Sequence, residues 1–159
     1  MRTCIVYSSA TGNTKKIAVG LADALGFPLY CVEEPPCLDE YDCFLLGFWV
    51  VRGLPDPKMR TFMESLAGKS VFFFATHGAW AESASIQKCK ESVRELLTRL
   101  GNHDLGCFTC QGRVHVPANS HHPMTPERKR RLEEASRHPN EEDLSICVRA
   151  VRDALVSLQ

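Results

Sequence analysis

The sequence has no long apolar run, no excess of either charge and no glycine-rich nucleotide fingerprint. Its longest apolar segment, Phe44 to Val51, has eight residues, whereas a membrane helix needs about 20. Lys plus Arg and Asp plus Glu each number 19, so the basic excess of a general nucleic-acid binder is missing. We therefore expect neither a membrane nor a nucleic acid among its partners.

We expect no secretory leader, because Met1 to Tyr7 run directly into a strand-like segment. The expected location is therefore the cytoplasm. The eight cysteines are then reduced thiols and not a disulfide framework, since most of them occur inside apolar patterns. A chain of 159 residues is long enough to bury a core of its own, and we expect a single domain over residues 1–159.

Short apolar runs alternate with helical patterns along the chain. The runs are continuously apolar, which is typical of a parallel sheet covered on both faces. The expected fold class is therefore α/β. The expected strands are 3–7, 29–32, 43–48, 70–75 and 105–109; helices are expected to end at Gly26, Gly68 and Gly101 and to begin after Asp56 and Asn140.

Residues 114–139 interrupt this alternation because they are rich in proline and histidine. Within them, Thr125-Pro126-Glu127 predicts the start of a short basic helix, Arg128 to Arg137, that stops before Pro139. We interpret the segment as an insertion between the last strand and the last helix.

Three loops at the ends of predicted strands have unusual compositions: residues 8–14, 48–55 and 76–82. Ligands of open parallel sheets bind beyond the carboxyl ends of the strands, where the chain order reverses. The first loop combines a glycine with hydroxyl and amide side chains just before a predicted helix. Because the first N–H groups of a helix favour an anion, this loop predicts a phosphate site; the alternative is an ordinary helix cap with a polar turn.

Other phosphate-binding loops do not fit the sequence. The first loop has no Gly-Lys-Ser/Thr ending and only one glycine, Gly12, which excludes a Walker loop and a dinucleotide fingerprint. A phosphatase-type loop needs a cysteine and an arginine within it, but Cys4 lies inside the preceding strand.

Residues 7–14, Tyr-Ser-Ser-Ala-Thr-Gly-Asn-Thr, resemble the FMN phosphate loop of flavodoxins, whose pattern is Ser/Thr-x-Thr-Gly-x-Thr. The later motifs are similar to a subgroup of flavodoxin-family proteins linked to bilirubin reductase in gut bacteria. These further similar segments are 47–50, 74–80, 110–112, 122–128 and 138–143.

The resemblance implies a flavodoxin-like three-layer sandwich that binds FMN noncovalently, with a five-stranded parallel sheet of order 2-1-3-4-5. The first loop then holds the phosphate, without the hydroxyl that relatives often have at Ala10, and the other two loops face the isoalloxazine ring. No metal site is expected. The implied site residues are Ser9, Ala10, Thr11, Gly12, Asn13 and Thr14 at the phosphate and Phe48, Trp49, Val50, Thr76, His77, Gly78, Ala79 and Trp80 at the ring.

Three residues near the expected ring differ from the pattern of relatives. Gly53 comes late for the backbone flip that many flavodoxins make near flavin N5. One hypothesis is that Arg52 raises the second reduction potential by favouring negative charge, and the alternative is a solvated loop arginine. His77 replaces an apolar residue; it hydrogen-bonds the ring near N1 or O2, or titrates with it near neutral pH, or is a surface or packing histidine, which is the favoured alternative.

Two further patterns have weaker functional signals. Cys107-x-x-Cys110 has redox spacing but lies in or just after a strand, where a structural role is favoured. His115, His121 and His122 lack partner ligands for a metal.

The function implied by the resemblance is electron transfer from an external flavin- or ferredoxin-type reductase to an electron-accepting protein, because the chain has no dinucleotide fingerprint of its own. The alternative is an FMN-dependent reductase that acts directly on a small acceptor such as a quinone or nitro compound, with residues 114–139 as a lid. A binding module without flavin is a third hypothesis, which the phosphate loop disfavours. Whether the chain is an enzyme stays open, and a carrier is favoured.

Overall fold

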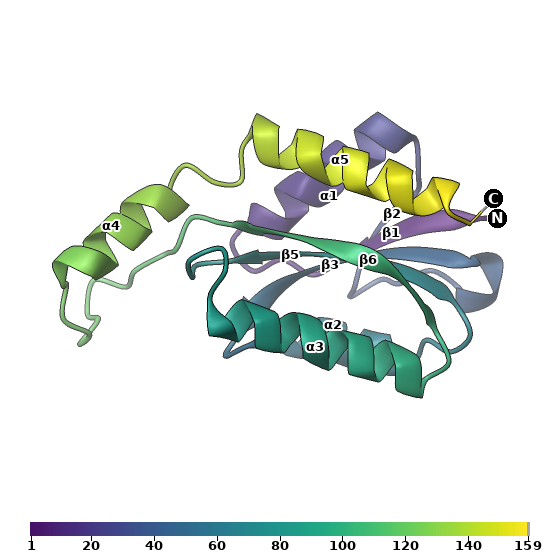
Figure 1. Cartoon of the computed structure of the whole chain (residues 1–159), viewed down its shortest axis with the longest axis horizontal. Coiled ribbons are helices and arrows are strands. Elements are labelled where there is room, and N and C mark those ends of the chain that lie inside the picture. The colour runs from purple at the N-terminus through teal and green to yellow at the C-terminus, as the bar shows by residue number, and fades with distance from the viewer. Residues whose placement is uncertain (159) are drawn as a thin grey trace.

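The computed structural model describes residues 1–158 and has three layers. A central sheet is covered by α1 and α5 on one face and by α2 and α3 on the other (Figure 1). The elements in chain order are β1 Thr3–Tyr7, α1 Asn13–Leu25, β2 Leu29–Cys31, a 3₁₀ turn Leu38–Glu40, β3 Cys43–Val51, β4 Leu54–Pro55, α2 Pro57–Glu64, β5 Ser70–His77, α3 Ala84–Arg99, β6 His103–Gln111, α4 Pro126–Ala135 and α5 Glu141–Val156.

The strand order is β2-β1-β3-β5-β6, and all of these neighbours are parallel. The short strand β4 pairs with the end of β3 in antiparallel fashion and lies off this path. Setting β4 aside, the order is the 2-1-3-4-5 expected from the sequence, so the predicted fold is confirmed. The chain order reverses between β1 and β3, which is where such sheets bind ligands.

The continuous apolar character of the strands follows from burial on both sides. Successive residues of a strand point to opposite faces, and Phe73 packs in the core under α2 and α3 while Phe74 packs in the core under α1 and α5. Both side chains are almost fully buried. A strand in this position has no polar face, and the sequence shows none.

Helix boundaries largely follow the local capping signals. Gly26 ends α1 with a positive φ of 72°, and Asp56 caps α2 by accepting a hydrogen bond from the Met59 amide at 3.2 Å. Asn140 and Asp143 form a capping box at α5. One predicted end was wrong, because α2 stops at Glu64, four residues before Gly68.

Strand β3 is longer than predicted because Trp49 to Val51 continue it as one side of a hairpin with β4. Val51 pairs with Leu54, and the two residues between them have positive φ angles, 52° for Arg52 and 74° for Gly53. Two positive φ angles are typical of the type I′ turn that suits a tight hairpin. The expected second loop is therefore mostly strand, and Gly53 serves the turn.

After β6, residues 112–140 leave the three layers and include α4, which stands apart from them (Figure 1). Thr125 caps α4 by accepting a hydrogen bond from the Arg128 amide at 3.1 Å, and Pro126 occupies the first turn. The predicted start at Thr125-Pro126-Glu127 is therefore confirmed, and the helix ends at Ala135, two residues before the predicted Arg137. Along residues 1–158, none of the helices combines the length and apolarity needed to cross a membrane.

Candidate functional site

A cavity of about 220 Å³ opens at the carboxyl ends of β1, β3, β5 and β6. Ten of the fourteen residues expected at the flavin line it: Ser9, Ala10, Thr11, Asn13, Thr14, Trp49, Val50, Thr76, His77 and Gly78. The remaining lining residues are Gly112, Arg113, Val114 and His115. The structure thus gathers most of the predicted site and adds one segment to it.

The first turn of α1 is open toward this cavity. Its capping position is Gly12, with a φ of 98°, and within residues 1–158 no side chain caps the helix. Asp56 and Thr125, by contrast, cap α2 and α4 with side-chain oxygens. The Gly12 amide instead donates to Ser9 Oγ at 3.1 Å. The following N–H groups are left for an anion, as the positive end of a helix favours.

The polar side chains of the loop divide into exposed and internally bonded ones. Thr11 is exposed. The Thr14 hydroxyl is buried and bonds the Thr76 hydroxyl at 2.8 Å, which joins α1 to the end of β5. Asn13 donates from Nδ2 to the Arg113 carbonyl oxygen at 2.9 Å. Asn13 and Thr14 therefore also hold neighbouring segments in position around the cavity.

A buried contact beneath the loop involves Asp56, which the sequence indicated only as a helix cap. Its Oδ1 accepts a hydrogen bond from Ser8 Oγ at 2.8 Å in addition to the bond from Met59. Oδ2 is buried, and no partner for it occurs among residues 1–158. Asp56 therefore ties the start of the phosphate loop to the start of α2.

The aromatic residues expected at the ring take three different positions. Phe48, expected at the ring, is fully buried and stacks on Phe73, with ring centroids 6.0 Å apart, so its side chain lies in the core and not on the cavity lining. Trp49 and Val50 line the cavity from the extended β3. Trp80 is 42% exposed and lies outside the lining.

His77 is buried at the end of β5, in an environment that favours a packing role. Its Nδ1 lies 3.2 Å from the Ala79 carbonyl oxygen, which also accepts from Gln111 Nε2 at 3.0 Å. Because a carbonyl only accepts, Nδ1 holds the proton. Nε2 is buried without a partner in the described chain. Burial lowers the pKa of His77 to about 4, which fits the favoured interpretation of a packed histidine better than titration near neutral pH.

Sequence reasoning missed residues 112–115 as part of the site. Their approach to the other loops is close: a Cβ on Gly78 would lie 2.4 Å from Val114 Cγ2, and one on Gly112 would lie 2.6 Å from Asn13 Nδ2. The two glycines are therefore needed for space, and Gly112 is the signal that the sequence offered.

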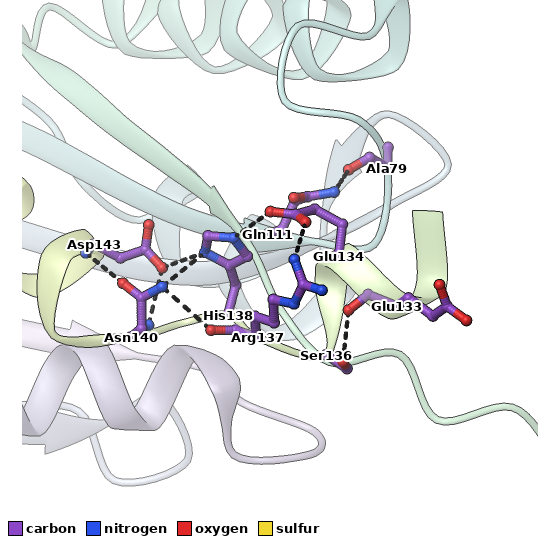
Figure 2. A network of polar contacts seen from close by, with 9 residues as sticks. All are labelled: Ala79, Gln111, Glu133, Glu134, Ser136, Arg137, His138, Asn140 and Asp143. Atoms are coloured by element: carbon purple, nitrogen blue, oxygen red, sulfur yellow. Dashed lines mark hydrogen bonds and ion pairs between the residues drawn. The ribbon is translucent and has the colours of Figure 1, made fainter. Parts of the chain in front are cut away.

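The base of the long segment after β6 is held by charged side chains (Figure 2). His138 bonds Asp143 Oδ2 through Nδ1 at 2.6 Å and Glu134 Oε1 through Nε2 at 3.2 Å. The hydrogen bond with Asp143 is the main cause of a raised pKa at His138. Arg131 donates to the Gly78 carbonyl oxygen at 2.6 Å, which attaches α4 to the cavity rim.

The cysteine pair of β6 does not form a redox site, and the histidines noted in the sequence do not gather as metal ligands in residues 1–158. Cys107 and Cys110 both lie in β6, an odd number of residues apart, so they face opposite sides of the sheet and pack in different cores. Burial raises the pKa of both thiols. Nowhere in residues 1–158 do three His, Cys, Asp or Glu side chains gather as a metal site requires.

The sequence profile of the flavodoxin domain matches residues 4–152. The chain belongs to the flavodoxin family. This flavodoxin-family protein is 27% identical to the flavodoxin-like domain-containing protein BilS of Clostridioides difficile (strain CD3), over 91% of this chain and 90% of that protein. The family resemblance stated from the phosphate loop is thereby confirmed.

Solved structures show the same fold. A flavodoxin from the domain Archaea has a TM-score of 0.64 at 16% identity and covers 99% of this chain and 98% of its own. A flavoprotein from Lactobacillus acidophilus NCFM, solved in complex with FMN, has a TM-score of 0.55 at 17% identity and covers 68% of this chain and 92% of its own. At such identities the likeness supports the fold alone.

Proposed function

We propose that this flavodoxin-family protein binds FMN at the cavity and carries electrons from an external reductase to an acceptor protein. The observation that carries the proposal is the uncapped start of α1, which opens beside hydroxyl side chains into a cavity with Trp49 on its lining. The FMN complex of the Lactobacillus acidophilus flavoprotein supports it from a protein of similar fold. When bound, FMN supplies transfer of one or two electrons through its isoalloxazine ring.

The residues present fit this cofactor. A phosphate dianion needs several donors, and the free N–H groups of α1 together with Ser9 and Thr11 provide them without a lysine or arginine in the loop. An aromatic ring needs a flat apolar contact, which Trp49 offers. Thr14 and Asn13 orient the loop through their bonds to Thr76 and Arg113.

The direct reduction of a small molecule is the less supported alternative. The sequence suggested residues 114–139 as a lid for such an enzyme, but α4 stands away from the layers (Figure 1). Residues 112–115 line the cavity wall, and the remainder of the segment leads outward. This arrangement leaves the rim accessible to a protein partner, which favours the carrier.

The test compares FMN with riboflavin, which lacks the phosphate. We expect FMN to bind at least about tenfold more tightly, since charge-assisted hydrogen bonds each contribute roughly 1.5–3 kcal/mol. Thr11→Ala should weaken FMN binding and leave riboflavin binding unchanged, whereas Thr61→Ala, an exposed threonine on α2, should change neither. Fluorescence quenching on titration of the unmodified protein and the two variants with each flavin gives all six dissociation constants. Equal affinity for the two flavins would contradict the phosphate site.

The carrier role needs a second measurement. With FMN bound, consumption of NADH or NADPH in the presence of a quinone or nitro compound should be negligible until a flavin-dependent reductase is added. Rapid turnover without that reductase would instead establish the direct enzyme.

A further inference from the structure

Helix α4 contributes little to the folded core. Among its residues in the described chain, Ala135 is buried and the others are exposed or half-buried. The helix stands clear of the three layers (Figure 1). It is nevertheless well formed, with a Thr125 cap and Pro126 in its first turn. A capped, attached helix that adds so little burial is available for contact with another molecule.

Residues 112–139 hold a local excess of positive charge within a chain of zero net charge. The segment has six basic and three acidic side chains, a net charge of +3, so the remainder of the chain has −3. The basic residues are Arg113, Arg128, Lys129, Arg130, Arg131 and Arg137, and the acidic ones are Glu127, Glu133 and Glu134.

Three of these cations already have partners. Arg131 bonds the Gly78 carbonyl, Arg128 bonds the His122 carbonyl at 2.6 Å, and Arg137 pairs with Glu134. The side chains of Arg113, Lys129 and Arg130 are exposed, and none of them has a hydrogen bond or ion pair within residues 1–158. They are the cations that a partner would meet.

An apolar hollow adjoins Lys129. It has a volume of about 370 Å³ and is lined by Met124, Lys129, Leu132, Glu133 and Ser136. Met124 is 53% exposed, although methionine is an adaptable apolar side chain that proteins usually bury. An apolar centre with a charged rim is the composition of a protein docking surface.

We propose that α4 and this hollow dock an acidic partner protein that exchanges electrons with this chain. The proposal rests on the proposed function and specifies the partner's surface: carboxylates opposite Lys129 and Arg130 of α4, and an apolar side chain that enters the hollow beside Lys129. The bond from Arg131 to the Gly78 carbonyl places the surface next to the cavity rim. In the transfer, one electron leaves the reduced flavin and reduces one oxidised centre of the partner.

The observations favour a protein over a nucleic acid or a membrane. Three unpaired cations next to three glutamates give little attraction for a phosphate backbone, whose binding scales with the number of neutralised phosphates. Between Pro126 and Ala135 the one large apolar residue is Leu132, which is too little for insertion at a lipid interface.

The experiment uses the FMN-loaded protein, reduced anaerobically with dithionite and mixed rapidly with a ferric haem protein. The probes are the soluble domain of cytochrome b5, which is acidic, and cytochrome c, which is basic, each followed by its ferrous absorbance. Lys129→Glu/Arg130→Glu is compared with Arg149→Glu/Arg152→Glu, an exposed pair on α5 that gives the same change in net charge. Flavin absorbance of each variant confirms that it still binds FMN.

We expect the α4 variant to slow reduction of cytochrome b5 by about tenfold at low salt and the α5 variant by less than about threefold, within the range that electrostatic steering gives. High salt should remove this difference. Met124→Ala should slow the reaction further at high salt, unlike Val156→Ala, a control on α5 that is also an exposed apolar side chain.

Equal slowing by the two charge variants would assign the effect to net charge and overturn the docking surface. The unmodified protein should reduce cytochrome b5 faster than cytochrome c, and the α4 variant should lose this preference. If the preference persists in the α4 variant, the docking surface is excluded. Saturable binding of a DNA duplex or of anionic vesicles that depends on Lys129 and Arg130 would overturn the choice of a protein partner. Failure to bind FMN at all would refute the proposed function, which is a different outcome.

Discussion

The backbones of His77 and His138 are held by two consecutive residues, Gly112 and Arg113, but the side chains of the two histidines have opposite environments. The Gly112 amide donates to the His77 carbonyl oxygen at 2.8 Å, and the next amide, of Arg113, donates to the His138 carbonyl oxygen at 3.0 Å. His77 ends a core strand, whereas His138 lies at the base of the projecting segment (Figure 2). The end of β6 thus joins the core to the segment that extends from it.

The two side chains show that surroundings, not residue type, decide the response to pH. His77 is buried without a carboxylate partner, so burial lowers its pKa to about 4. His138 bonds Asp143 and Glu134, and these bonds raise its pKa. Acid should therefore weaken the core at His77 while it strengthens the attachment at His138.

The largest expected effect is acid destabilisation through His77. The unfolded histidine has a pKa of about 6.5, above the folded value, so the unfolded state binds more protons and stability falls as pH drops from about 6.5 toward 4. The loss by pH 4.5 is about 2–3 kcal/mol. The measurement is urea unfolding without added flavin at pH 7.5 and 4.5. Between these pH values, the free energy of unfolding of His77→Leu should fall by about 2–3 kcal/mol less than that of the unmodified protein. An equal loss in both proteins would contradict the assignment.

The next effect concerns the contact between the two regions at Gly78. In Gly78→Ala the new Cβ would lie 2.4 Å from Val114 Cγ2, and such overpacking typically costs about 1–3 kcal/mol. Val114→Ala in the same chain should restore most of the stability, because it removes the colliding methyl group. A double-mutant cycle by urea unfolding measures this coupling. If Gly78→Ala costs the same with either residue at position 114, the segment does not pack on the rim as described.

A smaller effect with the opposite sign is expected at His138. Because its folded pKa is raised, its contribution is fully present below about pH 6.5 and is lost as pH rises through the folded value. Proteolytic cleavage within residues 112–139 should therefore be faster at pH 8.5 than at pH 6. In His138→Gln the rate should be nearly independent of pH. Removal of a carboxylate partner of His138 should also reduce the dependence on pH. Glu134→Gln tests this, because Asp143 also completes the capping box of α5 and its substitution would disturb that helix.

The same contrast describes what the sequence could predict. Core strands and caps follow from local patterns, such as the apolar run at 70–75 and the Asn140 cap, and both were correct. The hairpin at Arg52 and Gly53 was missed because the residues before it, Trp49 to Val51, are apolar and resemble the ring contacts of a loop. The burial of Phe48 could not be predicted either, because β3 continues to Val51 and so places Phe48 in the core and not at the rim.

The contribution of residues 112–115 to the cavity could not be predicted from local pattern at all. It depends on contacts between segments far apart in sequence, namely Asn13 with Arg113 and Arg131 with Gly78. The same holds for the pKa of His77, since burial is a property of the packed structure and not of the residue. Local sequence patterns do not predict tertiary contacts of this kind.

Arg52 should show the smallest effect because it combines a full charge with full exposure. It lies at the hairpin tip with a φ of 52°, a region that strains most residues, so Arg52→Asn removes the charge while tolerating the turn better than alanine does. An exposed charge contributes roughly 0.2–1 kcal/mol, so the second reduction potential of the FMN-loaded protein should fall by at most about 40 mV. The fall should shrink as salt rises, since exposed charges are screened. A larger fall that persists at high salt would place the guanidinium against the ring, and no fall would leave Arg52 as a solvated residue of the turn.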